Sequence, residues 1–206
     1  MKYIKMLGLA AVAAAALMAF VGASTASATV LCKVNTATTG CHVGGNAYAK
    51  GTTIKGNLTA TAILETVGGE VLNKCTGSTL EGKTETTGGA AETVEGKILT
   101  LSWSGCEKHT TTLSTGKLVI HYSEKDNGTL TASGTEVTIN GIFGTSCVYG
   151  AGEGLNLGTV VGGSPATIAI NTIVPRISGG FLCPAEARWT ASYELTSPKP
   201  LYIAEN

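Results

Sequence analysis

The residues best placed to do chemistry in this chain are Cys106 and His109, which form a C-x-x-H spacing within SGCEKHTTTL. A cysteine and a histidine at this spacing can present two zinc ligands from one turn. His121 follows twelve residues later and Cys75 lies upstream, so a full ligand set is conceivable. No second C-x-x-C or C-x-x-H motif completes it. The alternative interpretation is that Cys106 forms a disulfide beside an ordinary surface histidine.

The start of the chain is typical of a secretory signal peptide. Two lysines form a short basic region, and the uncharged apolar run MLGLAAVAAAALMAFVG follows. This run is shorter than a typical transmembrane helix, and it leads to the small-x-small motif ASA. We therefore predict cleavage between Ala28 and Thr29, which gives a signal peptide, 1–28, and one mature domain, 29–206.

All six cysteines lie after the predicted cleavage point. Nothing outside the cell keeps thiols reduced, so an even number of cysteines in an exported chain predicts disulfides. Six cysteines allow fifteen pairings, and the order of the sequence favours the local one. The favoured bridges are Cys32–Cys41, Cys75–Cys106 and Cys147–Cys183. Because this pairing leaves no thiolate for zinc, we predict no metal site and no cofactor.

The composition argues against several classes of function. Without residues 1–28 the chain has 12 Lys and Arg (14 minus 2) against 14 Asp and Glu, a formal net charge of −2. Such a chain lacks the positive charge that binds nucleic acid or an anionic membrane surface. Nothing after residue 28 is long and apolar enough to be a transmembrane helix. Apolar residues are plentiful, which favours a folded domain over a disordered tail.

Threonine and glycine dominate the mature sequence, and no stretch has a convincing helical period. Threonine-rich segments such as TATAILET fit a pleated surface. Glycine-containing breaks such as VGGE, TTGGAA and ISGG recur at short intervals. Short strands with turn signals at this spacing are typical of all-β domains. We predict a single antiparallel β-sandwich, jelly-roll or immunoglobulin-like in style, with roughly ten short strands.

Several segments alternate between apolar and polar residues, as half-buried antiparallel strands do. In KILTLSW, the alternation places Leu99, Leu101 and Trp103 on one face. KLVIHY and RWTASYELT alternate in the same way. The predicted core aromatics are Trp103, Tyr122, Trp189 and Tyr193. The other predicted strands include 70–76, 79–86, 128–133, 136–140, 158–162, 167–173 and 200–203.

The clearest local prediction concerns Asn127-Gly128 in SEKDNGTLTA, because this dipeptide is the strongest two-residue hairpin signal. We predict that Asn127 and Gly128 form the turn between a strand that ends near Ser123 and a strand at Thr129–Ser133.

Catalytic machinery is hard to find in the sequence. The G-x-S-x-G motif of a nucleophile elbow is absent, and the nearest segment, GGSPA, lacks the final glycine. The histidines are His42, His109 and His121, and the single aspartate, Asp126, falls at the predicted hairpin tip. Glutamates fall on the polar faces of threonine-rich strands. We therefore predict a protein that is not an enzyme, with a hydrolase using a Glu/His pair as an alternative.

Several segments suggest a family: the signal run, KCTGSTLEGKT, LTLSWSGC, DNGTLTASG and GGFLCPAEARWTASYELTSPKPLYI. In these segments the chain resembles a family of small secreted, disulfide-containing, β-rich proteins of high-GC Gram-positive bacteria. The resemblance implies export, disulfides and a β-sandwich. It implies no activity and no functional residue.

The leading hypothesis is a secreted or cell-envelope protein that works by binding or as a structural subunit. Threonine-rich faces and strand edges suggest two partners: cell-wall polymer, or further copies of the chain paired edge to edge. The alternative hypothesis is an extracellular carrier that holds a small apolar ligand between its sheets.

Overall fold

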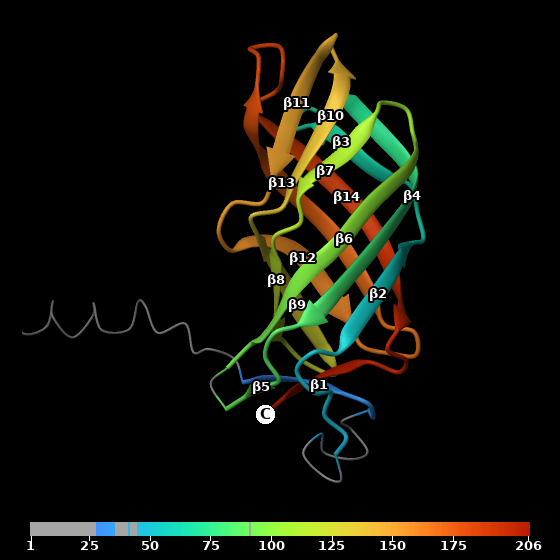
Figure 1. Ribbon diagram of the computed structural model, residues 1–206, viewed down its shortest axis with the longest axis vertical. Coiled ribbons are helices and arrows are strands. Elements are labelled where there is room, and N and C mark those ends of the chain that lie inside the picture. The colour runs from blue at the N-terminus through green and yellow to red at the C-terminus, as the bar shows by residue number, and fades with distance from the viewer. Residues whose placement is uncertain (1–27, 36–40, 42–44, 91) are drawn as a thin grey trace, which may run out of the picture.

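The computed structural model describes residues 28–35, 41, 45–90 and 92–206. Apart from Ala28, the predicted signal peptide therefore lies outside the described residues. The described chain is all-β and antiparallel, which confirms the predicted fold class, but it has 15 strands rather than about ten (Figure 1). None of the described residues forms a helix that could cross a membrane. The strands are β1 Thr29–Cys32, β2 Thr53–Leu58, β3 Ala62–Thr66, β4 Val71–Thr84, β5 Gly88–Gly89, β6 Val94–Cys106, β7 Thr110–Ser114, β8 Lys117–Tyr122, β9 Asn127–Ser133, β10 Glu136–Ile142, β11 Thr145–Gly150, β12 Leu155–Val161, β13 Thr167–Gly179, β14 Glu186–Ser197 and β15 Tyr202–Glu205.

Twelve strands form one sheet, and this sheet closes on itself. Its order is β2-β14-β3-β4-β6-β8-β9-β12-β13-β11-β10-β7, with β14 also paired to β13 and β2 to β4. Its two halves face each other across the core, as in a sandwich, and the long hairpin of β13 and β14 joins them (Figure 1). Among the described strands of this sheet, β7 alone has a single neighbour.

Four long strands, β4, β6, β13 and β14, run through the whole closed sheet. At one end β2, β8, β9 and β12 complete the circuit of strands, and we call this part the lower ring. At the other end β3, β7, β10 and β11 lie with the long strands and form the upper ring (Figure 1). The buried apolar residues of the two rings form two clusters, a larger main core that lies mostly in the lower ring and a smaller one in the upper ring. Leu155 and Trp189 pack against both clusters.

A small sheet, β15-β1-β5, covers the lower end of the molecule (Figure 1). Leu31 of β1 and Ile203 of β15 are almost fully buried and belong to the main core. The hydroxyl of Thr29, the first residue of β1, accepts a 2.8 Å hydrogen bond from the backbone N–H of Tyr122. The first and last described strands are therefore part of the packed core of the lower ring.

The chain contains three disulfides with the predicted pairing, and it has no free cysteine. Cys75 and Cys106 lie directly opposite each other on β4 and β6. Cys147 of β11 is joined to Cys183, which lies between β13 and β14. The Cys106 sulfur is consequently not a thiolate, and it cannot serve as the zinc ligand that its C-x-x-H spacing suggested.

The predicted alternation holds in β14, but in β6 it fails at Leu99, where a β-bulge falls. The residues on either side of Leu99 pair with Glu81 and Gly82 of β4, while Leu99 itself has no partner. One extra residue reverses which side chains face the core. Ile98 and Leu101 are therefore buried, whereas Leu99 is 45% exposed. The predicted core position of Leu99 is wrong.

The hairpin of β8 and β9 is present, but its turn is not at Asn127 and Gly128. Lys125 and Asp126 make the turn, with positive φ angles of 48° and 67°. Asn127 and Gly128 are the first residues of β9. A Cβ atom on Gly128 would lie 2.6 Å from the backbone oxygen of His121, so this glycine permits a close approach of two strands. The predicted turn residues are wrong, although the strands that they were expected to join are paired.

Two predicted strands, 70–76 and 79–86, are a single strand, β4. Gly77 lies between the two predicted ranges. A Cβ atom on Gly77 would lie only 2.3 Å from the hydroxyl oxygen of Ser104 on β6. The glycine therefore allows close cross-strand packing instead of a turn.

Candidate functional site

An apolar cavity lies between the strands of the upper ring. The cavity and the open solvent that adjoins it together make up about 620 Å³ of space. Its walls come from β3, β4, β6, β7, β10, β11, β13 and β14, so every strand of the upper ring contributes, and Leu157 of β12 lines it from the lower ring. Most lining side chains are aliphatic or aromatic, and none carries a charge. Binding pockets for small molecules commonly have this mainly apolar character.

Two tryptophans form the aromatic part of the wall. Trp103 and Trp189 pack edge to face, with ring centroids 6.1 Å apart and an interplanar angle of 65°. The Trp103 indole N–H donates to the hydroxyl of Thr112 over 3.1 Å, which satisfies its polar group. The chain has no other tryptophan, so its intrinsic tryptophan fluorescence comes from this cavity alone.

The four predicted core aromatics differ in burial. Tyr193 is 2% exposed and lies within the core. Trp103, Tyr122 and Trp189 are half-buried and pack against it. The predicted side of each strand was right, but both tryptophans border the cavity instead of filling the core.

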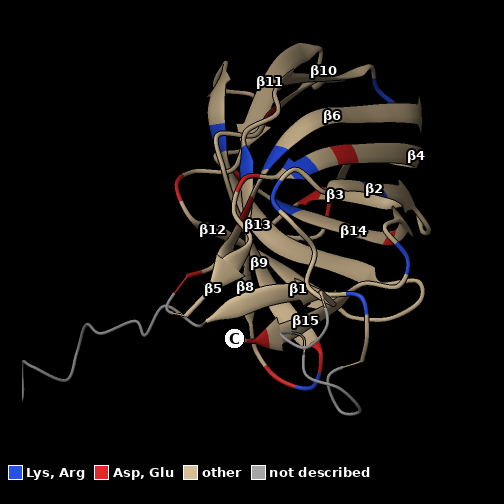
Figure 2. Cartoon of the chain, turned by 60° about the horizontal axis from the view of Figure 1, so that its bottom comes forward, with Lys and Arg blue, Asp and Glu red and all other residues tan. Residues whose placement is uncertain are grey.

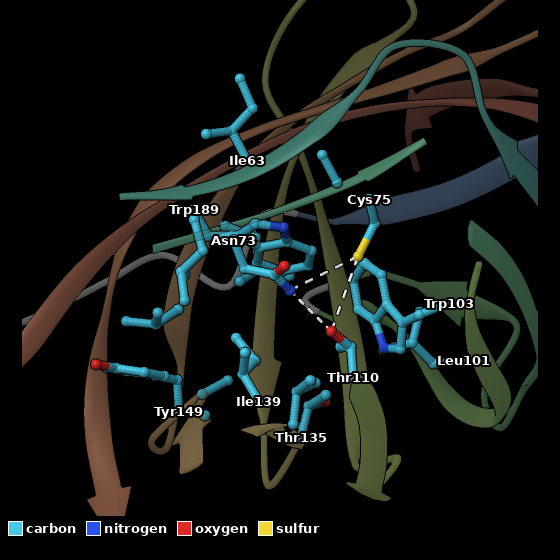
Figure 3. Close-up of a pocket in the computed structure, with 17 residues that line it drawn as sticks. Ile63, Asn73, Cys75, Leu101, Trp103, Thr110, Thr135, Ile139, Tyr149 and Trp189 are labelled. Carbon is cyan, nitrogen blue, oxygen red and sulfur yellow. Dashed lines mark hydrogen bonds between the residues drawn. The ribbon is translucent and has the colours of Figure 1, made fainter. Parts of the chain in front are cut away.

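Two polar side chains of the cavity wall, Asn73 and Thr110, form hydrogen bonds with each other and with one turn. The Asn73 amide donates to the Thr110 hydroxyl over 2.8 Å, and its oxygen accepts the backbone N–H of Lys108. The Thr110 hydroxyl donates to the carbonyl of Lys108. Figure 3 shows Asn73 and Thr110 linked beside Cys75 and the Trp103 ring. These groups fix the turn that joins β6 to β7 and leave a largely apolar surface for a ligand.

The absence of charge in the wall restricts what the cavity can hold. A charged ligand would lose its hydration and gain no opposite charge in return. Positively charged lysines and arginines lie interspersed with negatively charged aspartates and glutamates, and most of the chain is uncharged (Figure 2). The geometry therefore suits a neutral molecule that gains mainly from apolar burial and contact with aromatic rings.

A second apolar space, of about 570 Å³, lies in the lower ring. Its walls include Leu80, Val160 and Leu201, and the exposed Lys83 and Lys97 lie at its edge. It has no aromatic wall. The cavity of the upper ring is consequently the better candidate for specific recognition.

No protein-family model matches the chain. No curated protein and no solved structure matches it either.

The histidines do not meet a carboxylate in the described part of the chain. His109 is exposed, and its Nδ1 lies 3.1 Å from the side-chain nitrogen of Asn140. His121 lies 3.5 Å from the hydroxyl of Thr131. His42 lies outside the described residues. No group of three or more His, Cys, Asp or Glu among the described residues is arranged to hold a metal ion.

No pattern in the sequence indicates Asn73, Thr110 and Thr112 as residues that shape this site. Each lies in a threonine-rich or polar segment like many others. Ala62 and Ala151, which make room in the cavity wall, look like ordinary buried positions. Only the paired tryptophans carried a signal, because large aromatic residues are few in this chain.

Tyr193 is a buried titratable group in the core. Burial raises the pKa of its phenol from 10.0 to about 12, although its hydrogen bond to Ser78 lowers the pKa. The Tyr193 hydroxyl donates to the Ser78 hydroxyl over 2.9 Å. Both residues are buried, so the neutral phenol is the form that fits the core.

We expect the stability of the protein to fall between about pH 10 and pH 12 because of Tyr193. The folded protein keeps this proton while the unfolded chain loses it, so the free energy of unfolding falls by about 1.4 kcal/mol per pH unit. The change Tyr193→Phe should remove this contribution, and urea unfolding from pH 9 to pH 11 measures it. Tyr193→Phe leaves the buried Ser78 hydroxyl without its partner, so the double variant Tyr193→Phe with Ser78→Ala serves as the control. Equal pH slopes in both variants and the parent would contradict the assignment.

Proposed function

We propose that this protein is a non-enzymatic binding protein that carries a small, neutral, apolar molecule in the cavity of its upper ring. The observation that carries the proposal is the uncharged cavity with its edge-to-face pair, Trp103 and Trp189. Apolar burial is the main source of affinity in such a site. An aromatic molecule would also gain from contact with the tryptophan rings.

We place this function outside the cell or at the cell envelope. The three disulfides are consistent with an oxidising compartment. The signal-peptide pattern before Thr29 supports the same location. A carrier outside the cell would keep a poorly soluble molecule in solution by shielding it from water.

The test is a titration with the neutral dye N-phenyl-1-naphthylamine. The protein is made from the full chain by a host that exports it, and its intrinsic tryptophan fluorescence is followed. We expect saturable quenching with a dissociation constant on the order of 10 μM, since a dye of this size gains roughly 0.4 kcal/mol per heavy atom. The anionic dye 8-anilinonaphthalene-1-sulfonate is the matched control and should bind at least about tenfold more weakly.

Failure of the neutral dye to bind, together with no small molecule in a solvent extract of the protein, would overturn the proposal. Binding of the anionic dye at equal strength would contradict the neutral ligand class. Both results are independent of where the protein is exported.

Other candidates have less support from the geometry. Edge-to-edge assembly needs free strand edges, and closure of the large sheet leaves β7 as its single described strand with one neighbour. A hydrolase with His109 or His121 as base needs a carboxylate in contact, and neither histidine forms an ion pair in the described part of the chain. Cell-wall polymer as a partner rests on the composition alone.

A further inference from the structure

The upper ring has one place where its strands are not joined by a backbone ladder. From Ile98 onward β6 pairs with β4 on one side, and β7 pairs with β10 alone. We call the boundary between Ile98–Cys106 and Thr110–Ser114 the seam. All other neighbours around the upper ring are held by antiparallel pairing.

Two hydrogen bonds cross the seam in the described residues, and both depend on one side chain. The Thr112 hydroxyl donates to the carbonyl of Leu101 over 2.7 Å and accepts from the Trp103 indole over 3.1 Å. Just below the seam, the N–H of Ile98 donates to the carbonyl of Gly116. Opening the seam above Ile98 therefore breaks two hydrogen bonds, while parting any other pair of strands breaks a ladder.

Apolar side chains lie on both the inner and the outer face of the seam. Leu101, Trp103 and Thr110 line the cavity. On the outer side, the bulge leaves Leu99 45% exposed, and Leu113 of β7 is 60% exposed. An apolar molecule would thus meet apolar side chains both before and after passing between the strands.

We infer that the seam between β6 and β7 is the entrance to the cavity, and that Thr112 controls how often it opens. This inference rests on the proposed ligand-binding function. Parting β7 from β6 displaces Trp103 from its partner and opens the wall directly into the cavity. The turn between β6 and β7 stays anchored by Asn73, so the strands separate without detaching.

The test measures rates of binding, because an entrance changes kinetics more than affinity. Thr112→Val removes both bridging hydrogen bonds and keeps the shape of the side chain. We expect association and dissociation of N-phenyl-1-naphthylamine, followed in a stopped-flow instrument by the dye's emission, both to become about tenfold faster. The dissociation constant should stay nearly unchanged, since both rates depend on the same opening. Thr111→Val, at an exposed neighbour on β7, is the control and should leave the rates unaltered.

A second variant closes the entrance. Leu99→Cys with Leu113→Cys places thiols on both sides of the seam, and the native cysteines are all in disulfides. Linking the two thiols with a bismaleimide should slow association at least about tenfold, whereas capping each thiol with N-ethylmaleimide should not. Parent-like rates in both Thr112→Val and the linked protein would overturn the inference and leave the binding function intact. If the parent protein binds no dye, the proposed function itself fails and the entrance fails with it.

Discussion

Replacing Ala62 with phenylalanine is expected to weaken binding of N-phenyl-1-naphthylamine at least about 100-fold. Ala62 lies on β3, is 5% exposed and lines the cavity of the upper ring. A phenyl ring at this position would occupy the space that the ligand needs. The measurement is the same tryptophan fluorescence titration, and the expected loss corresponds to about 2.7 kcal/mol of binding free energy.

The matched control is Ala169→Phe, which adds the same ring to an exposed position on β13. This variant should bind the dye like the parent. Overpacking a core costs typically 1–3 kcal/mol, so the melting temperature of Ala62→Phe has to be measured alongside. Ala151→Phe fills the cavity from a different part of the wall and should give the same loss. If both filled variants fold and still bind, the dye occupies another site.

This prediction depends on a cavity that the sequence did not reveal, although much of the fold could be predicted. The pattern in RWTASYELT gave the correct buried face of β14, because that strand pairs with β13 without a register shift. Tyr193 and Leu195 are each 2% exposed, as the alternation predicts. Period-two patterns are informative wherever the pairing is regular.

The same rule failed in β6 because a bulge depends on the partner strand. Gly82 of β4 lies beside the bulge, and a Cβ atom there would be 2.9 Å from the backbone oxygen of Lys97. The segment KILTLSW alone does not predict that contact. The exposure of Leu99, which matters for the proposed entrance, is therefore a property of two strands together.

The cavity itself arises from closure of the sheet, which is a long-range property. Its walls combine residues as distant in sequence as Ala62, Thr110 and Trp189. The alternation of the sequence correctly predicts both tryptophans on the inner face, but it does not predict whether the interior is filled by side chains or contains a cavity. That difference depends on how many small side chains from separate strands meet at the same level.

Removing the Cys147–Cys183 disulfide is expected to lower the free energy of unfolding by about 4 kcal/mol. The two cysteines are 36 positions apart, so the bridge restricts a long loop in the unfolded chain. Both sulfur atoms are also deeply buried, since Cys147 is 0% and Cys183 2% exposed. The variant Cys147→Ala with Cys183→Ala keeps these positions apolar, and urea unfolding at neutral pH measures the loss.

Cys32→Ala with Cys41→Ala is the matched control, because that bridge spans only 9 positions. The chain-entropy model gives a smaller loss for it, about 2.5 kcal/mol. The informative result is which double variant loses more free energy of unfolding. A larger loss for the longer loop indicates an effect of loop closure, whereas equal losses indicate a general effect of removing buried sulfur. If the short bridge costs as much as the long one, local packing of the native sulfurs dominates. The hairpin of β13 and β14, which closes the large sheet, would then be held mainly by its own strand pairing.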